Sequence, residues 1–127
     1  MPAHDLSLLI DCARQAGQVA LSYTGATALR WDKPLGAGPV TEADLAVNAM
    51  LHERLMQARP DYGWLSEESD DNAVRLGQSH VFIIDPIDGT RSFIEGADTW
   101  SHSLAVARDG EIIAAVVYLP MLDRLYA

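Results

Sequence analysis

The sequence is poor in cysteine, in basic residues and in long apolar segments. Its single cysteine, Cys12, excludes an internal disulfide framework and is typical of a reducing compartment, so we expect a cytoplasmic protein. No apolar run approaches the ~20 residues that a membrane-spanning helix needs. The N-terminus does not pair a basic segment with an apolar one, so no signal peptide is expected.

Basic side chains are outnumbered two to one by acidic ones. There are 9 Lys and Arg against 18 Asp and Glu, which gives a formal net charge of −9. This charge disfavours a nucleic-acid polymer or an anionic membrane as a partner, because both are themselves negative. The 127 residues are 49% hydrophobic and fit one globular domain with a real core. Such an acidic protein can still bind phosphate esters where metal ions mediate the contact.

Several motifs that carry chemistry in other proteins are missing. No glycine-rich loop of the G-x-x-x-x-G-K type is present, and His, Cys and Ser do not cluster as a nucleophilic triad. The histidines lack metal-ligand spacing and are expected to be structural or exposed: His4, His52, His80 and His102. Cys12 falls on an apolar helical stripe and is expected to be a packed thiol. Carboxylates are therefore the groups to examine.

The stretch from Val81 to Thr90 carries the strongest functional signal. Four apolar residues at 81–84 predict a short strand buried on both faces, which leads into Asp85-Pro86-Ile87-Asp88. Two carboxylates at the end of a buried strand repel each other unless a cation cancels their charge, and oxygen ligands of this kind suit Mg²⁺. We expect both carboxylates and the Ile87 carbonyl to face one site.

The residues that follow this pair suggest an anion site beside the cation. Gly89 allows the backbone to approach a ligand closely, Thr90 offers a hydroxyl, and free N–H groups at 91–94 are expected to hold an anion such as phosphate. The alternative is structural, because Asp-Pro and Asp-Gly are ordinary turn dipeptides that often end strands.

Two helices are expected in the first half of the chain. Apolar residues at helical spacing predict the first from Asp5 to about Tyr23, with Gly25 as its end. Thr41 is a good N-cap for the second, which Pro60 stops. Asp44, three residues after Thr41, completes a capping box, so its carboxylate has a structural explanation as well as a functional one. Lys33 lies on a Gly- and Pro-rich loop, where it is either solvated or able to swing over a bound phosphate.

A second acidic segment follows a second short strand. Residues 64–66 predict this strand, and Glu67-Glu68-Ser69-Asp70-Asp71 comes directly after it. Such a run is usually a solvated loop. Two strands that end in carboxylates at one sheet edge would instead converge on one pocket.

The last third of the chain predicts β structure. A helical turn through Phe93 leads to Gly96, and strands follow at 101–108 and 111–119, joined by a hairpin turn at Asp109-Gly110. The second of these strands is apolar on both faces and is expected to be covered on each side. A further strand begins at Leu125. The fold class predicted is α/β, with two N-terminal helices packed on a largely antiparallel sheet.

These candidates combine into a site for phosphate-ester hydrolysis by metal-activated water. The set is Asp44, Glu67, Glu68, Asp85, Asp88 and Thr90. Glu67, Asp85 and the Ile87 carbonyl are expected to share one Mg²⁺, and Asp85 and Asp88 a second. Thr90, hydrogen-bonded to Asp44, is expected to orient the attacking water.

Three motifs in this order resemble the inositol monophosphatase superfamily. Asp85-Pro86-Ile87-Asp88-Gly89-Thr90 matches its D-P-[IL]-D-G-T signature, residues 39–44 resemble its V-T-x-x-D helix start, and Glu67-Glu68 its paired acids. The resemblance implies a magnesium-dependent, lithium-sensitive phosphatase of small phosphorylated metabolites, with a layered α/β fold and usually dimeric. It supports the roles given above. Residues around Glu67, Arg91 as a substrate contact, and the segment 118–126 lean toward the bisphosphate nucleotidase branch over inositol phosphatases.

One feature departs from the family pattern. Family members are longer and bring a further metal-binding Asp from a Trp-Asp motif in their second half, whereas the Trp-Asp here is Trp31-Asp32, followed by Lys33-Pro34. We therefore expect residues 1–127 to form the N-terminal metal-binding portion of a longer enzyme, with its second metal site one ligand short. A catalytically silent cation-binding module is the alternative. An end in mid-sheet also predicts exposed apolar strands and poor solubility for the chain alone.

Overall fold

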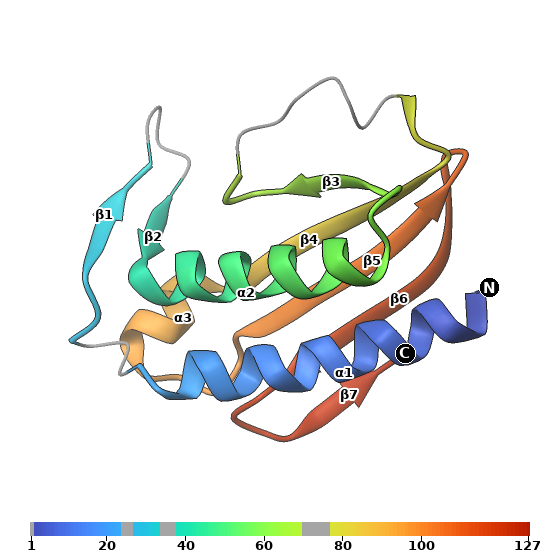
Figure 1. Ribbon diagram of the computed structural model, residues 1–127. Coiled ribbons are helices and arrows are strands. Elements are labelled where there is room, and N and C mark those ends of the chain that lie inside the picture. Colours follow the sequence, from blue (N-terminus) through green and yellow to red (C-terminus); the bar gives the residue numbers. More distant parts are fainter. Residues whose placement is uncertain (1, 24–26, 34–37, 70–76) are drawn as a thin grey trace.

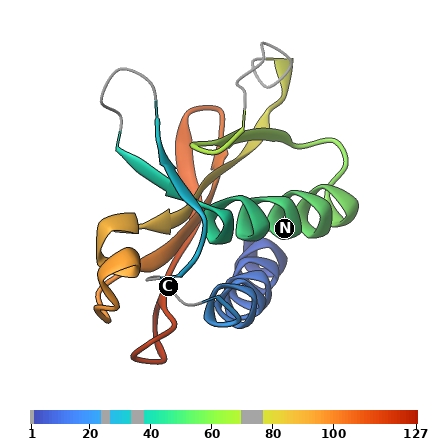
Figure 2. The ribbon, with the colours of Figure 1, turned by 90° about the vertical axis from the view of Figure 1, so that its left-hand side faces the viewer.

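Two long helices pack on one face of a β-sheet. The computed structural model describes residues 2–23, 27–33, 38–69 and 77–127. Helices α1 (Pro2–Leu21) and α2 (Glu42–Ala58) lie on the same side of the sheet (Figures 1 and 2). The predicted positions at Gly25, residues 34–37, Asp70 and Asp71 fall outside the described residues.

The sheet is antiparallel except at one pair of strands. In the described part of the chain it has five strands in sequence order: β3 (Gly63–Ser66), β4 (His80–Asp88), β5 (Ser101–Arg108), β6 (Glu111–Leu119) and β7 (Arg124–Tyr126). Only the pair β3–β4 among them is parallel. Strands β1 (Arg30–Asp32) and β2 (Pro39–Thr41) form a separate antiparallel ribbon, and α3 (Thr90–Glu95) follows β4. The predicted fold class is confirmed.

The parallel pair brings two acidic segments to one edge of the sheet. Ser66, the last residue of β3, is paired with Ile84, and the Glu67 amide donates to the Ile84 carbonyl at 3.3 Å. Because parallel strands share their direction, Glu67 lies beside Asp85 where β3 ends. The predicted convergence of the two strand ends is confirmed.

Strand β4 runs further than the sequence suggested, through a bulge. We predicted that it would stop near Ile84, whereas it continues to Asp88. Asp85 pairs with Ser103 and Asp88 with Ser101, so two residues of β4 stand opposite one residue of β5. Pro86 has no N–H to give to the ladder, which is why an interruption is tolerated here.

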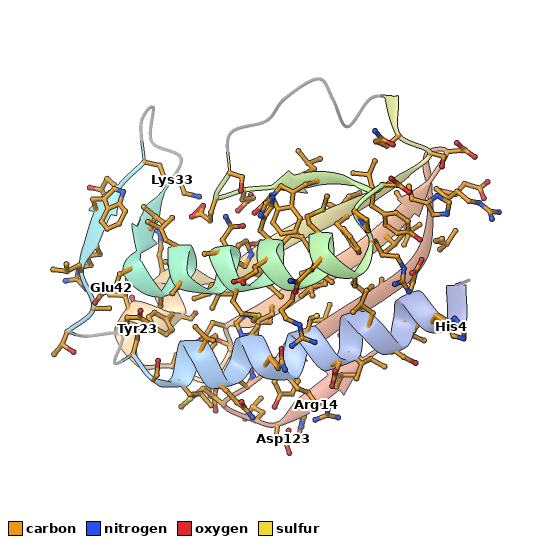
Figure 3. The ribbon with its side chains drawn as sticks, in the orientation of Figure 1. His4, Arg14, Tyr23, Lys33, Glu42 and Asp123 are labelled. Atoms are coloured by element: carbon orange, nitrogen blue, oxygen red, sulfur yellow. The ribbon has the colours of Figure 1, made fainter. Side chains whose placement is uncertain are left out.

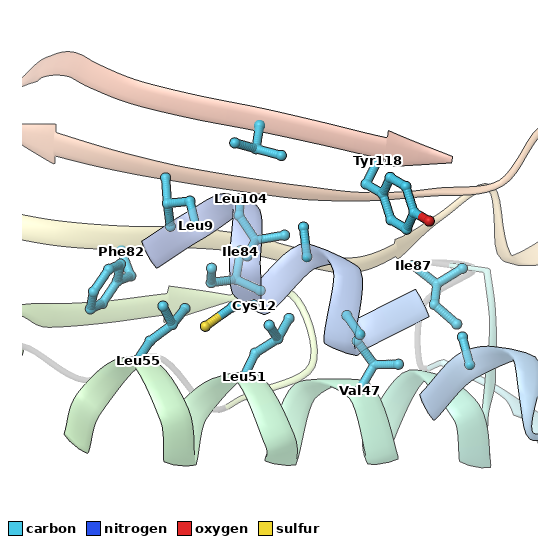
Figure 4. Close-up of a cluster of buried hydrophobic side chains, with 14 of the residues drawn as sticks. Leu9, Cys12, Val47, Leu51, Leu55, Phe82, Ile84, Ile87, Leu104 and Tyr118 are labelled. Carbon is cyan, nitrogen blue, oxygen red and sulfur yellow. The ribbon is translucent and has the colours of Figure 1, made fainter. Parts of the chain in front are cut away.

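The core lies between the helices and the sheet (Figure 4). Leu51 and Leu55 of α2 face Phe82 and Ile84 of β4, and all four side chains are buried. Cys12 of α1 is fully buried among them, and burial raises the pKa of its thiol. The prediction of a packed, unreactive cysteine agrees with this position.

The opposite face of the sheet is open among the described residues, which corrects two predictions. Ile83 in β4 is 37% exposed and Ile112 in β6 is 57% exposed, whereas both strands were expected to be buried on each face. Both described long helices pack on the other side, so alternate side chains of each strand face solvent. Apolar side chains of these strands are therefore exposed on this face. No helix in the described residues combines the length and apolar character needed to cross a membrane.

Local signals set most of the element boundaries. Thr41 caps α2 and forms the predicted capping box with Asp44. Asp109 and Gly110 adopt φ values of 50° and 86°, as a tight hairpin turn requires. Helix α1 begins at Pro2, which places Asp5 within the first turn rather than at the predicted start of the helix. The buried carboxylate of Asp5 accepts hydrogen bonds from Arg59 Nε at 3.0 Å and the Tyr62 hydroxyl at 2.9 Å.

Two leucines of α2 that differ in burial, Leu45 and Leu51, provide a test of the core. Leu51→Ala removes a fully buried side chain and is expected to lower the free energy of unfolding by about 3 kcal/mol. Leu45→Ala is the matched control on the same helix, where the side chain is 39% exposed, and should cost less than about 1 kcal/mol. Urea unfolding measures both, and equal losses would contradict this packing.

Candidate active site

A cavity of about 420 Å³ opens at the sheet edge where β3 and β4 end. It is lined by Glu67, Asp85, Ile87, Asp88, Gly89, Thr90 and Arg91, all of them predicted site residues, and by Lys33, Gly38, Pro39 and Ser92. The structure thus brings the predicted carboxylates and the Gly-Thr turn together. Asp44 does not line the cavity and reaches it only through Thr90.

Asp85 sits in excess negative charge. Burial is the main cause that raises its pKa from 3.8 to about 7, followed by the nearby charges of Glu67, Asp88 and Glu68. Lys33 acts in the opposite direction but does not balance them. A carboxyl group with this pKa holds a proton far more readily than an ordinary Asp.

Lys33 is held beside the cavity by an ion pair. Its side chain extends from the end of β1 toward the residues that follow β3 (Figure 3) and pairs with Glu68, whose side chain is 3% exposed. Burial works to lower the pKa of Lys33, but its hydrogen bond with Glu68 and the surrounding carboxylates outweigh burial and raise it. Of the two predicted alternatives, a freely solvated Lys33 is wrong. Glu68 is engaged with Lys33 and does not line the main cavity.

The Asp44 carboxylate performs two tasks with its two oxygens. Oδ2 accepts hydrogen bonds from the Thr41 amide at 2.9 Å and the Thr41 hydroxyl at 2.6 Å, which closes the helix cap. Oδ1 accepts from the Thr90 hydroxyl at 2.9 Å. The Asp44 side chain is 2% exposed, so this arrangement is fixed by packing. Structural and functional explanations for Asp44 are both consistent with the structure.

Gly89 shapes the turn between β4 and α3. It adopts φ 87°, and a Cβ at this position would lie 3.4 Å from Trp100 Cα, so a larger residue would be strained and crowded. The Phe93 amide donates to the Gly89 carbonyl at 3.0 Å. The Phe93 amide is therefore not free for an anion, contrary to the prediction for residues 91–94. The amides before it belong to the first turn of α3, whose N–H groups have no carbonyl partner within the helix.

The residues present fit a magnesium ion that keeps part of its water shell. No group of three or more His, Cys, Asp or Glu in the described residues is placed so that it could hold a metal ion by itself. Mg²⁺ needs no such cage, because it is commonly held by one or two carboxylates together with waters and substrate phosphates. The raised pKa of Asp85 and the carboxylates of Glu67 and Asp88 on the same cavity wall indicate negative charge that a hard cation would relieve.

Some residues at the site were not predicted. Gly38 and Pro39, at the start of β2, line the cavity although no role was predicted for them, whereas Ser92 falls within the segment 91–94 predicted as an anion site. The Gly-Pro pair was the only sequence signal at the first two positions. Trp31 and Asp32, examined as a departure from the family pattern, are exposed on β1 and do not line it.

Comparison with known proteins identifies the family. The sequence profile of the inositol monophosphatase family matches residues 2–127. The chain belongs to this family.

Several relatives show how the family resemblance is distributed. The inositol-1-monophosphatase of Rhizobium meliloti is 42% identical over 87 residues, covering 68% of this chain and 32% of the relative. The histidinol-phosphatase of Chlorobaculum parvum is 35% identical (96% and 46% covered), and the 3′(2′),5′-bisphosphate nucleotidase CysQ of Salmonella typhimurium 32% identical (95% and 50%). The structure of the extragenic suppressor protein suhB from Bartonella henselae matches with a TM-score of 0.87 at 31% identity, covering 96% of this chain and 47% of that one. The chain therefore spans between about a third and a half of the length of these relatives.

The pKa of Asp85 predicts a pH-dependent difference between the wild type and Asp85→Asn. The unfolded carboxyl titrates near 3.8 and the folded one near 7, so raising the pH from about 4 to about 7 progressively destabilises the folded wild type. Asn lacks this titration, so the stability of Asp85→Asn relative to the wild type should rise over this range and stay constant above it.

His102 makes the variant comparison necessary. Burial lowers its pKa to about 4, which contributes a trend of the opposite sign below pH 6.5 in both proteins and cancels in the difference. Urea unfolding of the metal-free proteins between pH 4 and 8 measures the difference. A constant difference would show that Asp85 is not perturbed.

Proposed function

We propose that the protein is a Mg²⁺-dependent phosphomonoesterase that acts on a small phosphorylated metabolite. The observation that carries the proposal is the cavity in which Glu67, Asp85 and Asp88 meet the Gly89-Thr90 turn. Carboxylates beside the start of a helix suit a cation and a phosphate group together. The cation would neutralise the carboxylates and the phosphate, and the amides at the start of the helix would bind the phosphate. Membership of the inositol monophosphatase family supports the same reaction class.

The roles of the metal ligands follow from their places on the wall. We assign Glu67, Asp85 and the Ile87 carbonyl to one Mg²⁺, and Asp85 with Asp88 to a second. When bound, Mg²⁺ supplies positive charge that acidifies water and stabilises the charge developing on phosphoryl oxygens. Asp88, Gly89, Thr90 and Arg91 line the part of the cavity where the phosphate would lie.

Thr90 and Asp44 are assigned to the attacking water. The Thr90 hydroxyl donates to Asp44 Oδ1 and Thr90 lines the cavity, so a lone pair of Thr90 Oγ1 can accept from a water there. A water that donates to this lone pair is oriented for attack, and its proton can pass through the hydroxyl to Asp44. Glu67, on the same wall, is the further acidic group near that water.

The substrate is proposed as a class and then by preference. The relatives named above are a phosphatase of inositol phosphate, one of histidinol phosphate and one of a bisphosphate nucleotide. Each name describes a phosphate ester of a small metabolite, and we propose this class. Within it we place the 3′(2′),5′-bisphosphate nucleotide ahead of inositol monophosphate on the residues around Glu67 and Arg91. Lithium sensitivity and a dimeric whole protein are further parts of the proposal.

A silent cation-binding module is the second candidate. The observation that favours it is the ion pair of Lys33 with Glu68, which takes one acid of the predicted set out of the cavity. Such a module would bind Mg²⁺ without turning over any ester. Calorimetric Mg²⁺ titration together with phosphate release from inositol monophosphate, histidinol phosphate and adenosine 3′,5′-bisphosphate, with and without Li⁺, separates the two candidates. Binding without release would support the module, and release that requires Mg²⁺ would support the enzyme.

Removing the shared carboxylate tests the metal assignment. Asp85→Asn is expected to abolish measurable Mg²⁺ binding in calorimetry and any Mg²⁺-dependent phosphate release, because Asp85 belongs to both proposed ion sites. Asp61→Asn, an exposed acid at a turn outside the cavity, is the control with the same change of charge. Unchanged affinity in Asp85→Asn would remove Asp85 from the site.

Thr90 allows metal binding to be separated from water orientation. Thr90→Val is expected to lower kcat by about 100-fold while Mg²⁺ affinity stays near that of the wild type. The variant loses the hydroxyl that donates to Asp44 at 2.9 Å and contacts the Ile87 carbonyl at 3.3 Å, but it keeps every proposed metal ligand. Thr90→Ser keeps the hydroxyl and should recover most of the activity. Phosphate-release kinetics measure both variants, and equal activity in Thr90→Val and the wild type would exclude the water-orienting role.

A further inference from the structure

The bulge in β4 leaves a buried carbonyl without a place in the sheet ladder. Pro86 lies between Asp85, which pairs with Ser103, and Asp88, which pairs with Ser101, and its side chain is fully buried. A buried carbonyl without a hydrogen-bond donor destabilises its local conformation. The conformation at stake is the turn that carries two proposed metal ligands, Asp85 and the Ile87 carbonyl.

His102 provides the missing donor. It is the β5 residue that stands opposite the bulge, and its ring Nδ1 is hydrogen-bonded to the Pro86 carbonyl. A carbonyl oxygen only accepts, so Nδ1 carries the proton. Burial lowers the pKa of His102 to about 4, so the ring is neutral at pH 7 and Nδ1–H is its single donor.

The other ring nitrogen shows that His102 is not a simple core filler. Its Nε2 is buried and has no hydrogen-bond partner among the described residues. An unpartnered polar atom is unfavourable inside a protein, and an aliphatic side chain would fill the same space without that disadvantage. The hydrogen bond to Pro86 is the interaction that a histidine adds at this position.

The same ring connects the bulge to the proposed phosphate side of the cavity. His102 packs edge-on against Trp100, with ring centroids 5.7 Å apart, and Trp100 packs edge-on against Phe93 of α3 at 5.1 Å. The Trp100 backbone also lies against Gly89. Both halves of the turn, the Asp85–Ile87 segment and the start of α3, therefore rest on one aromatic row.

We propose that His102 is a positioning residue of the metal site, which holds the Pro86 carbonyl so that Asp85 and the Ile87 carbonyl face the cavity together. The inference rests on the proposed function, since it concerns ligands assigned there. Groups that orient metal ligands without touching the metal commonly change metal affinity about 10- to 100-fold when they are replaced.

Replacing His102 by Asn or by Gln tests its hydrogen bond to Pro86 separately from the volume of its side chain. In His102→Asn the side-chain N–H can lie near the position of Nδ1, whereas in His102→Gln it lies one bond further out, near Nε2. Val106→Ala, on the same strand and fully buried but paired with Phe82 away from the bulge, is the control for general destabilisation. Mn²⁺ is the probe. Calorimetry of the 127-residue chain without any substrate then measures metal affinity alone.

The expected result is an ordered series of Mn²⁺ affinities. His102→Asn and Val106→Ala should bind within about threefold of the wild type, and His102→Gln about 10-fold more weakly. Thermal unfolding should show all three variants to be less stable than the wild type. Equal Mn²⁺ affinity for the Asn and Gln variants, or weakening that follows thermal stability through Val106→Ala, would overturn the positioning role.

Hydrogen exchange of the metal-free chain distinguishes failure of this inference from failure of the proposed function. Peptides covering residues 85–95 should exchange faster in His102→Gln than in His102→Asn or Val106→Ala. If the wild type does not bind Mn²⁺, the proposed metal site fails, and the exchange pattern still decides whether His102 holds the bulge. Equal exchange in all variants would overturn the inference.

Discussion

Repulsion between carboxylates is the constraint that dominates the cavity of this molecule. The fold brings these carboxylates together and does not fully neutralise them. The single parallel pairing among the described strands, between β3 and β4, brings Glu67 and Asp85 to one edge, and the bulge turns Asp88 toward the same space. In an antiparallel pair the two acidic segments would leave opposite ends of the strands. The accumulation of charge is therefore a property of topology, and it adds to burial, the larger cause, in raising the pKa of Asp85.

The features that oppose this repulsion are structural elements in their own right. Lys33 neutralises Glu68 from the β1–β2 ribbon, and Thr41 and Thr90 share the carboxylate of Asp44. The hydrophobic core holds the strands in register while these polar contacts set the directions of the side chains at the edge. A site of this kind needs a rigid sheet behind it, since small shifts of closely placed charges change their interaction strongly.

Local patterns in the sequence determined much of the fold. The strands at 101–108 and 111–119 and the turn between them were predicted with the bounds observed, because alternation and the Asp109-Gly110 pair are local signals. Burial on both faces of β4 and β6 was predicted wrongly. An apolar residue such as Ile112 shows that a position tolerates burial, but which face is covered depends on where α1 and α2 pack.

The residues of the candidate site likewise divide into those that the sequence predicted and those that it did not. Asp85, Asp88 and Thr90 stand in a compact motif and could be found from the sequence, and so could the cap residue Asp44. The contact of His102 with Pro86 could not, because it depends on the register of β5 against a bulge that no sequence pattern marks. Glu68 was a candidate without an assigned role, and its ion pair with Lys33 could not be predicted because the two residues are far apart in the sequence.

The two-sided use of Asp44 ties the first turn of α2 to the chemistry proposed for Thr90. In most helices, fraying of the first turn is a local loss of order with little effect elsewhere. Here the same fluctuation would release the hydroxyl that depends on Asp44 Oδ1. The activity proposed at this edge of the sheet would therefore be lost on heating at a lower temperature than that of global unfolding. Mutations that stabilise the first turn of α2 would raise the temperature up to which the activity is kept.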